Sequence, residues 1–242
     1  MKAAIALLAL ALLGAGEAAA HGRLAELSVY DRTEGRRLSV HWHEGRAYIV
    51  GKPGNEYQVT VRNRWREDVL AVVSVDGVNV ISGETAHPGQ TGYVLSRHGF
   101  YDILGWRKSL AETAAFYFTA LPDSYAARTG RPDNVGVIGV AVFRRKTGPR
   151  ASPQPIAPAD GAAARSGARV EGESSLGTGH GRREASYAQQ TTFERDTVAP
   201  VETISLYYDS YPNLLARGII REPIPVAPLP RPFPGFVADP RG

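Results

Sequence analysis

The chain has 242 residues, of which 43% are hydrophobic, a formal net charge of +4 and no cysteine. The lack of cysteine excludes disulfides, thiol catalysis and cysteine-ligated metal sites. Eight basic and four acidic residues between positions 144 and 184 account for the whole charge surplus. Because nucleic-acid binding normally needs a basic face on a folded element, this distribution argues against a nucleic-acid partner.

The N-terminus has the pattern of an export signal. Met1-Lys2 is a short charged start, residues 3–13 are apolar, and residues 14–20 are mostly small and end in an A-x-A site. We therefore expect residues 1–20 to be a signal peptide cleaved after Ala20, and the protein to be periplasmic or secreted in a Gram-negative bacterium. No later apolar run is long enough to span a bilayer, so we expect no transmembrane segment after signal removal.

Short alternating segments separated by turn residues predict a β-rich domain over residues 21–146. The segment 37–43 alternates strictly, with Trp42 on its apolar face and His41 and His43 on its polar face. The most sharply patterned stretch is 55–83, which reads as three strands joined by two turns.

Two features inside this stretch indicate how it packs. Residues 69–75 (VLAVVSV) are nearly all apolar, as expected of a strand buried on both faces. Asp76-Gly77 predicts a tight type I′ hairpin turn, because both central positions of that turn need a positive φ. Asp123 or Ser124 is expected to begin a single helical turn that Gly130 closes. The domain is predicted to be an antiparallel β-sandwich of about eight to nine strands with one or two short helices.

The C-terminal part divides by composition. Residues 147–185 are rich in Pro, Ala and Gly and are expected to form a flexible linker or long loop. Residues 186–220 contain one alternating strand and a short helix that Gly218 ends, too small to fold alone, so we expect them to pack on the sandwich. Residues 221–242 form a Pro-rich tail, which favours an extended polyproline conformation.

One candidate site is a metal centre built from histidine. If cleavage follows Ala20, the mature chain starts with His21, whose α-amine and imidazole together can chelate copper. This arrangement is similar to the histidine brace of lytic polysaccharide monooxygenases and copper-resistance proteins. His41 and His43 are the possible further ligands. The alternative is that His21 simply follows the cleavage site and that the other two lie on a solvated strand face.

A second candidate site is a sugar platform. The aromatic residues that could line it are Trp42, Trp65, Trp106, Tyr93, Tyr101 and Tyr125. Trp65 and Trp106 are expected at strand ends beside Arg66 and Arg107, where an aromatic ring can stack on a sugar and an arginine can bond its hydroxyls. The alternative is ordinary core and rim packing, since aromatic residues are abundant in any sandwich core.

Several segments, taken together, resemble a group of exported β-rich proteins of Gram-negative bacteria with no assigned activity. They are residues 72–83 (VVSVDGVNVISG), 105–107 (GWR), 124–130 (SYAARTG), 134–143 (NVGVIGVAVF), 177–181 (GTGHG) and 207–220 (YYDSYPNLLARGII). The resemblance implies no catalytic residues. We expect an exported binding or structural module rather than an enzyme, with an envelope protein or glycan as partner and no cofactor. Copper binding and glycan binding are the alternatives.

Overall fold

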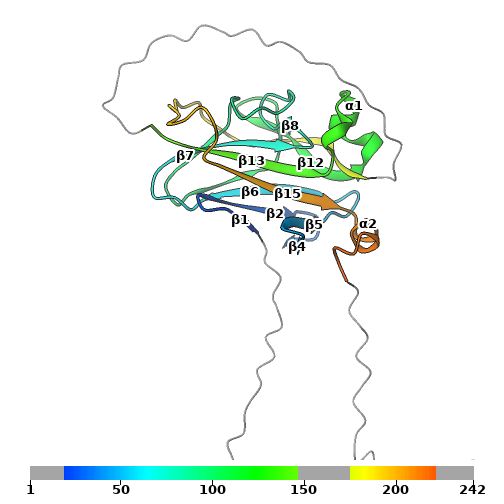
Figure 1. The fold of residues 1–242 in the computed structure, drawn as a ribbon. Helices are drawn as coiled ribbons and strands as arrows, with labels where there is room; N and C mark the ends of the chain where they lie inside the picture. The colour runs from blue at the N-terminus through cyan, green and yellow to red at the C-terminus, as the bar shows by residue number, and fades with distance from the viewer. Residues whose placement is uncertain (1–18, 147–174, 222–242) are drawn as a thin grey trace, which may run out of the picture.

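The computed structural model describes residues 19–146 and 175–221, which form two packed β-sheets (Figure 1). The predicted β-sandwich is confirmed. The first sheet contains β1 (Ala20–His21), β2 (Ala25–Asp31), β3 (Arg36–Arg37), β6 (Glu56–Asn63), β10 (Phe100–Ile103), β11 (Gly105–Arg107), β12 (Glu112–Ala120) and β14 (Leu176–Ala185).

The second sheet runs in the order β4-β5-β15-β13-β7-β8, with β9 also paired to β7. Its strands are β4 (His41–His43), β5 (Arg46–Val50), β7 (Val69–Val75), β8 (Val78–Asn79), β9 (Tyr93–Leu95), β13 (Val137–Arg144) and β15 (Glu202–Asp209). The pair β5–β15 is parallel, so this sheet is mixed rather than purely antiparallel. The strand segments outnumber the eight or nine expected, because turns and bends divide the chain into several strands of two to four residues.

Strand β7 is buried on both faces, as its continuous apolar sequence predicts. Alternate residues from Val69 to Val75 enter the main core between the sheets. The other face, with Leu70 and Val72, packs on Phe143 and on Phe193 from the segment after β14. This later segment therefore removes from water a face that a two-sheet sandwich would leave exposed.

The local turn and cap chemistry follows the sequence closely. Asp76 and Gly77 have φ values of 53° and 71°, as a type I′ turn requires. Helix α1 (Tyr125–Arg128) is capped by the Ser124 side chain, and the chain turns after it at Gly130, whose φ is 77°. Two short 3₁₀ turns flank this helix, at Leu121–Asp123 and Pro132–Asn134.

The expectation of a flexible segment up to residue 185 is wrong over its last ten residues, which form the long strand β14 paired with β12. Gly179 lies opposite Tyr117, and a Cβ at this glycine would come 2.1 Å from the tyrosine ring. The glycine therefore lets the ring lie across the strand, which compensates for the missing side chain. Residues 147–174 and 222–242, and the signal segment up to residue 18, lie outside the described residues.

The C-terminal strand is part of the sandwich and not an addition to it. β15 lies between β5 and β13. Helix α2 (Tyr211–Ala216) then covers the outer face of the second sheet, where Leu214, Ile219 and Ile220 pack against Tyr48. Ser210 caps the helix and Gly218, with a φ of 68°, lies just beyond its end.

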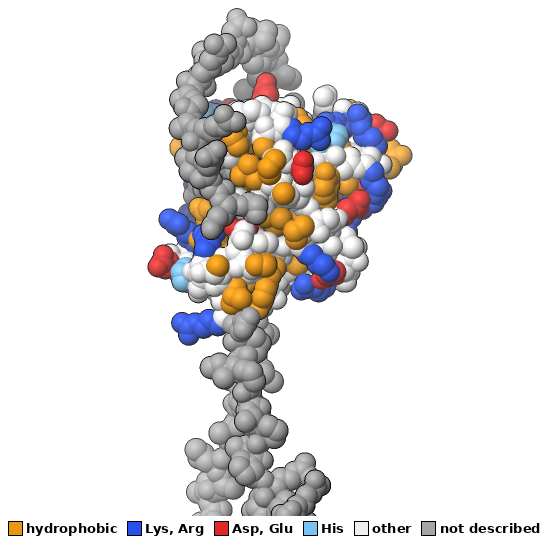
Figure 2. All heavy atoms as spheres, turned by 90° about the vertical axis from the view of Figure 1, so that its right-hand side faces the viewer, with side chains coloured by type: hydrophobic (Ala, Val, Ile, Leu, Met, Phe, Trp, Pro, Cys, Tyr) orange, Lys and Arg blue, Asp and Glu red, His pale blue; other side chains and the backbone are white. Residues whose placement is uncertain are grey.

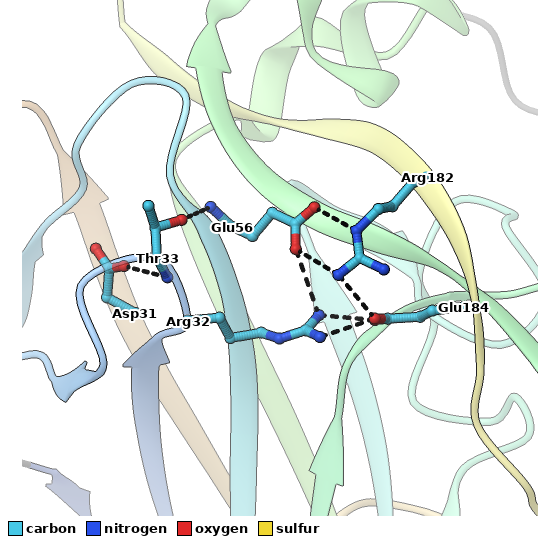
Figure 3. Close-up of polar contacts among 6 residues, drawn as sticks. All are labelled: Asp31, Arg32, Thr33, Glu56, Arg182 and Glu184. Atoms are coloured by element: carbon cyan, nitrogen blue, oxygen red, sulfur yellow. Dashed lines mark hydrogen bonds and ion pairs between the residues drawn. The ribbon is translucent and has the colours of Figure 1, made fainter.

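The outer face of the first sheet carries a network of ion pairs (Figure 3). Arg32 donates two hydrogen bonds, of 2.7 and 2.8 Å, to Glu184, and Arg182 donates two, of 2.9 and 3.0 Å, to Glu56. Cross contacts of 3.9 and 3.4 Å join the two pairs. The network links β14 to the β2 and β6 end of the sheet across β12.

Charged side chains of both signs also occur on the face shown in Figure 2. On this face, hydrophobic side chains run through the middle, and basic side chains alternate with acidic ones towards the margins. No helix in the described part of the chain is long and apolar enough to cross a membrane.

Candidate binding notch at the edge of the sandwich

The second sheet has an incomplete edge beside β15. Strand β5 pairs with β15 only from Leu206 to Asp209, whereas β13 pairs with it from Glu202 onwards. Within the described residues, the first half of β15 thus has a strand on one side only, and β1 lies near the other side (Figure 1). A hollow of about 480 Å³ opens there, which we call the edge notch.

Trp42 is one of the residues that line this notch. It pairs with Ala47, a core residue, so its side chain is on the inner face of the sheet, as the alternation predicts. However, β4 is the last strand of the sheet, and the first sheet does not cover it here. The tryptophan is therefore 50% exposed. The ring of Trp42 on β4 is therefore half-exposed at the edge notch.

The charges of the notch are mostly positive. Arg23 and Arg46 are exposed and line it together with His21 and one carboxylate, Glu202. The guanidinium carbon of Arg46 lies 5.9 Å from the centre of the Tyr207 ring, another lining residue.

The Glu202 carboxylate binds backbone N–H groups of the segment that follows β1. Its two oxygens accept hydrogen bonds from the N–H groups of Arg23, Leu24 and Ala25, at 2.5, 2.9 and 3.1 Å. A Cβ at position 22 would lie 2.6 Å from this carboxyl group, so Gly22 is what allows the close approach. The carboxylate therefore fixes one wall of the notch.

The three candidate histidines do not come together in one site. His41 and His43 pair with Tyr48 and Arg46, whose side chains lie on the outer face of the sheet, away from Trp42. Burial lowers the pKa of His41. His21 contacts Glu26 at 3.7 Å and Arg64 at 3.5 Å through its Nδ1 atom. No group of three or more His, Cys, Asp or Glu side chains suited to a metal occurs within residues 19–146 and 175–221. Copper binding stays a prediction.

Trp106, a candidate for the sugar platform, lies in the core and is 2% exposed, as the alternative of core packing has it. Its Nε1 atom donates to the carbonyl of Gly179 at 3.1 Å, and its ring meets Phe116 edge to face. Pairing with β12 places this ring between the sheets, where a ligand cannot reach it. Trp65 is partly buried against the core, with Arg66 over its ring.

The Arg107 side chain binds Ser186, the first residue after β14. Its guanidinium donates to the carbonyl and, at 3.1 Å, to the hydroxyl of Ser186, and to the hydroxyls of Tyr101 and Tyr93 at 3.2 and 3.5 Å. The two tyrosine rings are stacked, with centroids 4.7 Å apart. The arginine's donors are thus largely used within the protein, and it does not meet Trp65 or Trp106 in a shared cleft.

Sequence reasoning missed a polar cluster inside the core. Asp76 accepts hydrogen bonds from the Tyr208 hydroxyl at 2.5 Å, the Gly136 N–H at 2.9 Å and the Thr178 N–H at 2.8 Å. The Thr178 hydroxyl in turn lies 2.6 Å from both the Tyr208 and the Tyr57 hydroxyls. These side chains come from both sheets, so the cluster joins them. No local pattern signals it, because its members are far apart in the sequence.

Burial is the largest cause of the pKa shifts in this cluster. It raises the pKa of Asp76 to about 6, although the hydrogen bonds from Tyr208, Gly136 and Thr178 oppose the rise. Burial and the nearby Asp76 charge also raise the pKa values of Tyr57 and Tyr208 well above their usual range. All three residues are enclosed by the core.

No protein-family model matches this chain, and neither a curated protein nor a solved structure shows a significant match. The edge notch is therefore judged on its own geometry.

Proposed function

We propose that this chain is an exported protein of a Gram-negative envelope that binds a saccharide at the edge notch. The observation that carries the proposal is the half-exposed ring of Trp42 at the rim of a hollow of about 480 Å³. This volume falls in the range of small-molecule sites. Sugar rings have one face of C–H groups that stacks on an aromatic ring, and Trp42 offers such a ring.

We favour ligand binding over catalysis as the role of the protein. The groups with the most strongly raised pKa values, Asp76, Tyr57 and Tyr208, are those that general acid–base catalysis would use. They are fully buried and line no part of the notch. Their arrangement supports a structural role, whereas the notch combines an aromatic ring with hydrogen-bonding groups.

The test is retention of the purified exported protein on polysaccharide prepared from a Gram-negative envelope. We expect the wild-type protein to be retained and Trp42→Ala to lose about five- to 150-fold in affinity, by analogy with the stacking of nucleic-acid bases on aromatic rings, which contributes about 1–3 kcal/mol. Tyr187→Ala is the matched control, because that tyrosine is 80% exposed and does not line the notch. Equal loss in both variants, or no retention of the wild type, would contradict the proposal.

A further inference from the structure

We infer that the saccharide bound at the edge notch is acidic, with carboxylate groups on its sugar rings; this rests on the proposed function. The first observation is the state of the two arginines that line the notch. Arg23 and Arg46 are exposed, and neither guanidinium has a carboxylate within ion-pair distance among the residues that the structure describes. Two cationic forks are therefore available to a ligand.

The one carboxylate of the notch does not neutralise them. Both oxygens of Glu202 are occupied by three backbone N–H groups after β1. A carboxylate held in this way has little remaining capacity for an arginine fork. The notch thus keeps a positive character next to an apolar ring.

The combination of an aromatic ring with arginines favours a sugar acid over a simple anion. Arg46 lies over Tyr207 on the outer face of the sheet, and Trp42 stands on the inner face of the neighbouring strand, so the two side chains reach the notch from opposite sides of the sheet edge. Thr203 and Ser205 are exposed on β15 and add hydroxyl groups to the lining. An oligosaccharide that stacks one ring on the tryptophan can place the carboxylate of a neighbouring ring beside an arginine at the same edge, where the paired N–H donors match the two oxygens.

An extended peptide is the competing occupant, because the first half of β15 offers an open strand edge. That edge covers only Glu202–Ser205, less than the usual length of a strand. Pairing along it would also leave the tryptophan and the arginines without a defined role. The acidic saccharide accounts for all of these groups.

The experiment is calorimetric titration of the purified full-length protein with a galacturonic-acid hexamer and with the same hexamer after reduction of its carboxyl groups to alcohols. We expect the acidic hexamer to bind at least tenfold more tightly at low salt, and the difference to shrink as salt is added. Arg46→Gln and Arg23→Gln should each weaken the acidic hexamer about tenfold and leave the neutral one unchanged, since bonds to charged groups are the stronger ones.

Two variants control for indirect effects. Arg46→Lys keeps a positive charge and should retain part of the preference, and Arg62→Gln removes an exposed arginine that does not line the notch. Equal affinity for both hexamers, lost on Trp42→Ala, would overturn the inference and leave the saccharide proposal standing. Failure to bind either hexamer would overturn both, as would binding of an acidic hexapeptide in their place.

Discussion

The carboxylate of Asp76 lies in the core, where groups from both sheets donate hydrogen bonds to it. The same residue has a φ of 53° at the first central position of the β7–β8 turn. Aspartate tolerates that backbone conformation better than most residues, and its short side chain reaches Thr178 on the opposite sheet. One residue thus sets the turn and ties the two sheets together.

Protonation of Asp76 makes the stability of the fold depend on pH. Its folded-state pKa of about 6 is above the ordinary value of 3.8, so the folded protein holds this proton more tightly than the unfolded chain. The resulting stabilisation is complete below pH 3.8 and is lost as the pH rises to about 6. The shift corresponds to about 3 kcal/mol.

We predict that Asp76→Asn removes this dependence. The variant is less stable overall, because an amide cannot accept all of the hydrogen bonds that the carboxylate accepts. The difference in unfolding free energy between pH 4 and pH 7, measured with urea, should change by about 2 kcal/mol relative to the wild type. The same pH dependence in both proteins would show that Asp76 does not titrate in this range.

Among the elements, β1 is short but is built into the core. Ala20 pairs with Leu27, and Ala19 and Ala20 are only 3% and 2% exposed. Cleavage after Ala20 would remove both residues, and Ala20 is one of the residues that line the edge notch. Gly16-Glu17-Ala18 offers another small-residue cleavage site two residues earlier.

We therefore predict that the proposed export leaves a mature chain that begins at Ala19 and keeps β1. Intact mass measurement or N-terminal sequencing of the exported protein decides this, and a start at His21 would contradict it. A protein made to start at His21 should be less stable than one starting at Ala19 by about 1–2 kcal/mol, from the burial of two methyl groups. A start at Ala19 would also leave His21 without the α-amine that a copper brace needs.

The elements that could be predicted from sequence are those that depend on residues close to one another in the chain. The β7 strand, the turn after it and the two serine-capped helices each follow from residues within a few positions. β14 could not be predicted in this way, because its glycines pack against residues distant in the sequence, such as Tyr117 opposite Gly179 about sixty residues earlier. The edge notch could not be predicted from the sequence either, because it depends on where β5 stops pairing with β15. Trp106, expected as part of a sugar platform, is instead buried, and its Nε1 atom donates to the Gly179 carbonyl of β14.

At the scale of the whole molecule, residues 21–146 do not contain a complete sandwich. β15 is an inner strand of the second sheet and β14 pairs along β12 in the first. We predict that a chain ending at Lys146 does not fold cooperatively, because it exposes the edges of β5, β12 and β13 together with the core. A chain ending at Arg221 is the control and should fold. Circular dichroism and urea unfolding test this, and a sharp unfolding transition in the shorter chain would contradict it.

The parallel pair β5–β15 also sets the order in which the protein can fold. Residues 47–50 have their partners at 206–209, so the second sheet cannot close until nearly the whole chain is available. Contacts of such long sequence separation form slowly. A chain that emerges N-terminus first keeps β5 unpaired on that side until its last strand arrives. This delay is compatible with the proposed export, because it favours an unfolded chain during passage through a narrow pore and folding only after release.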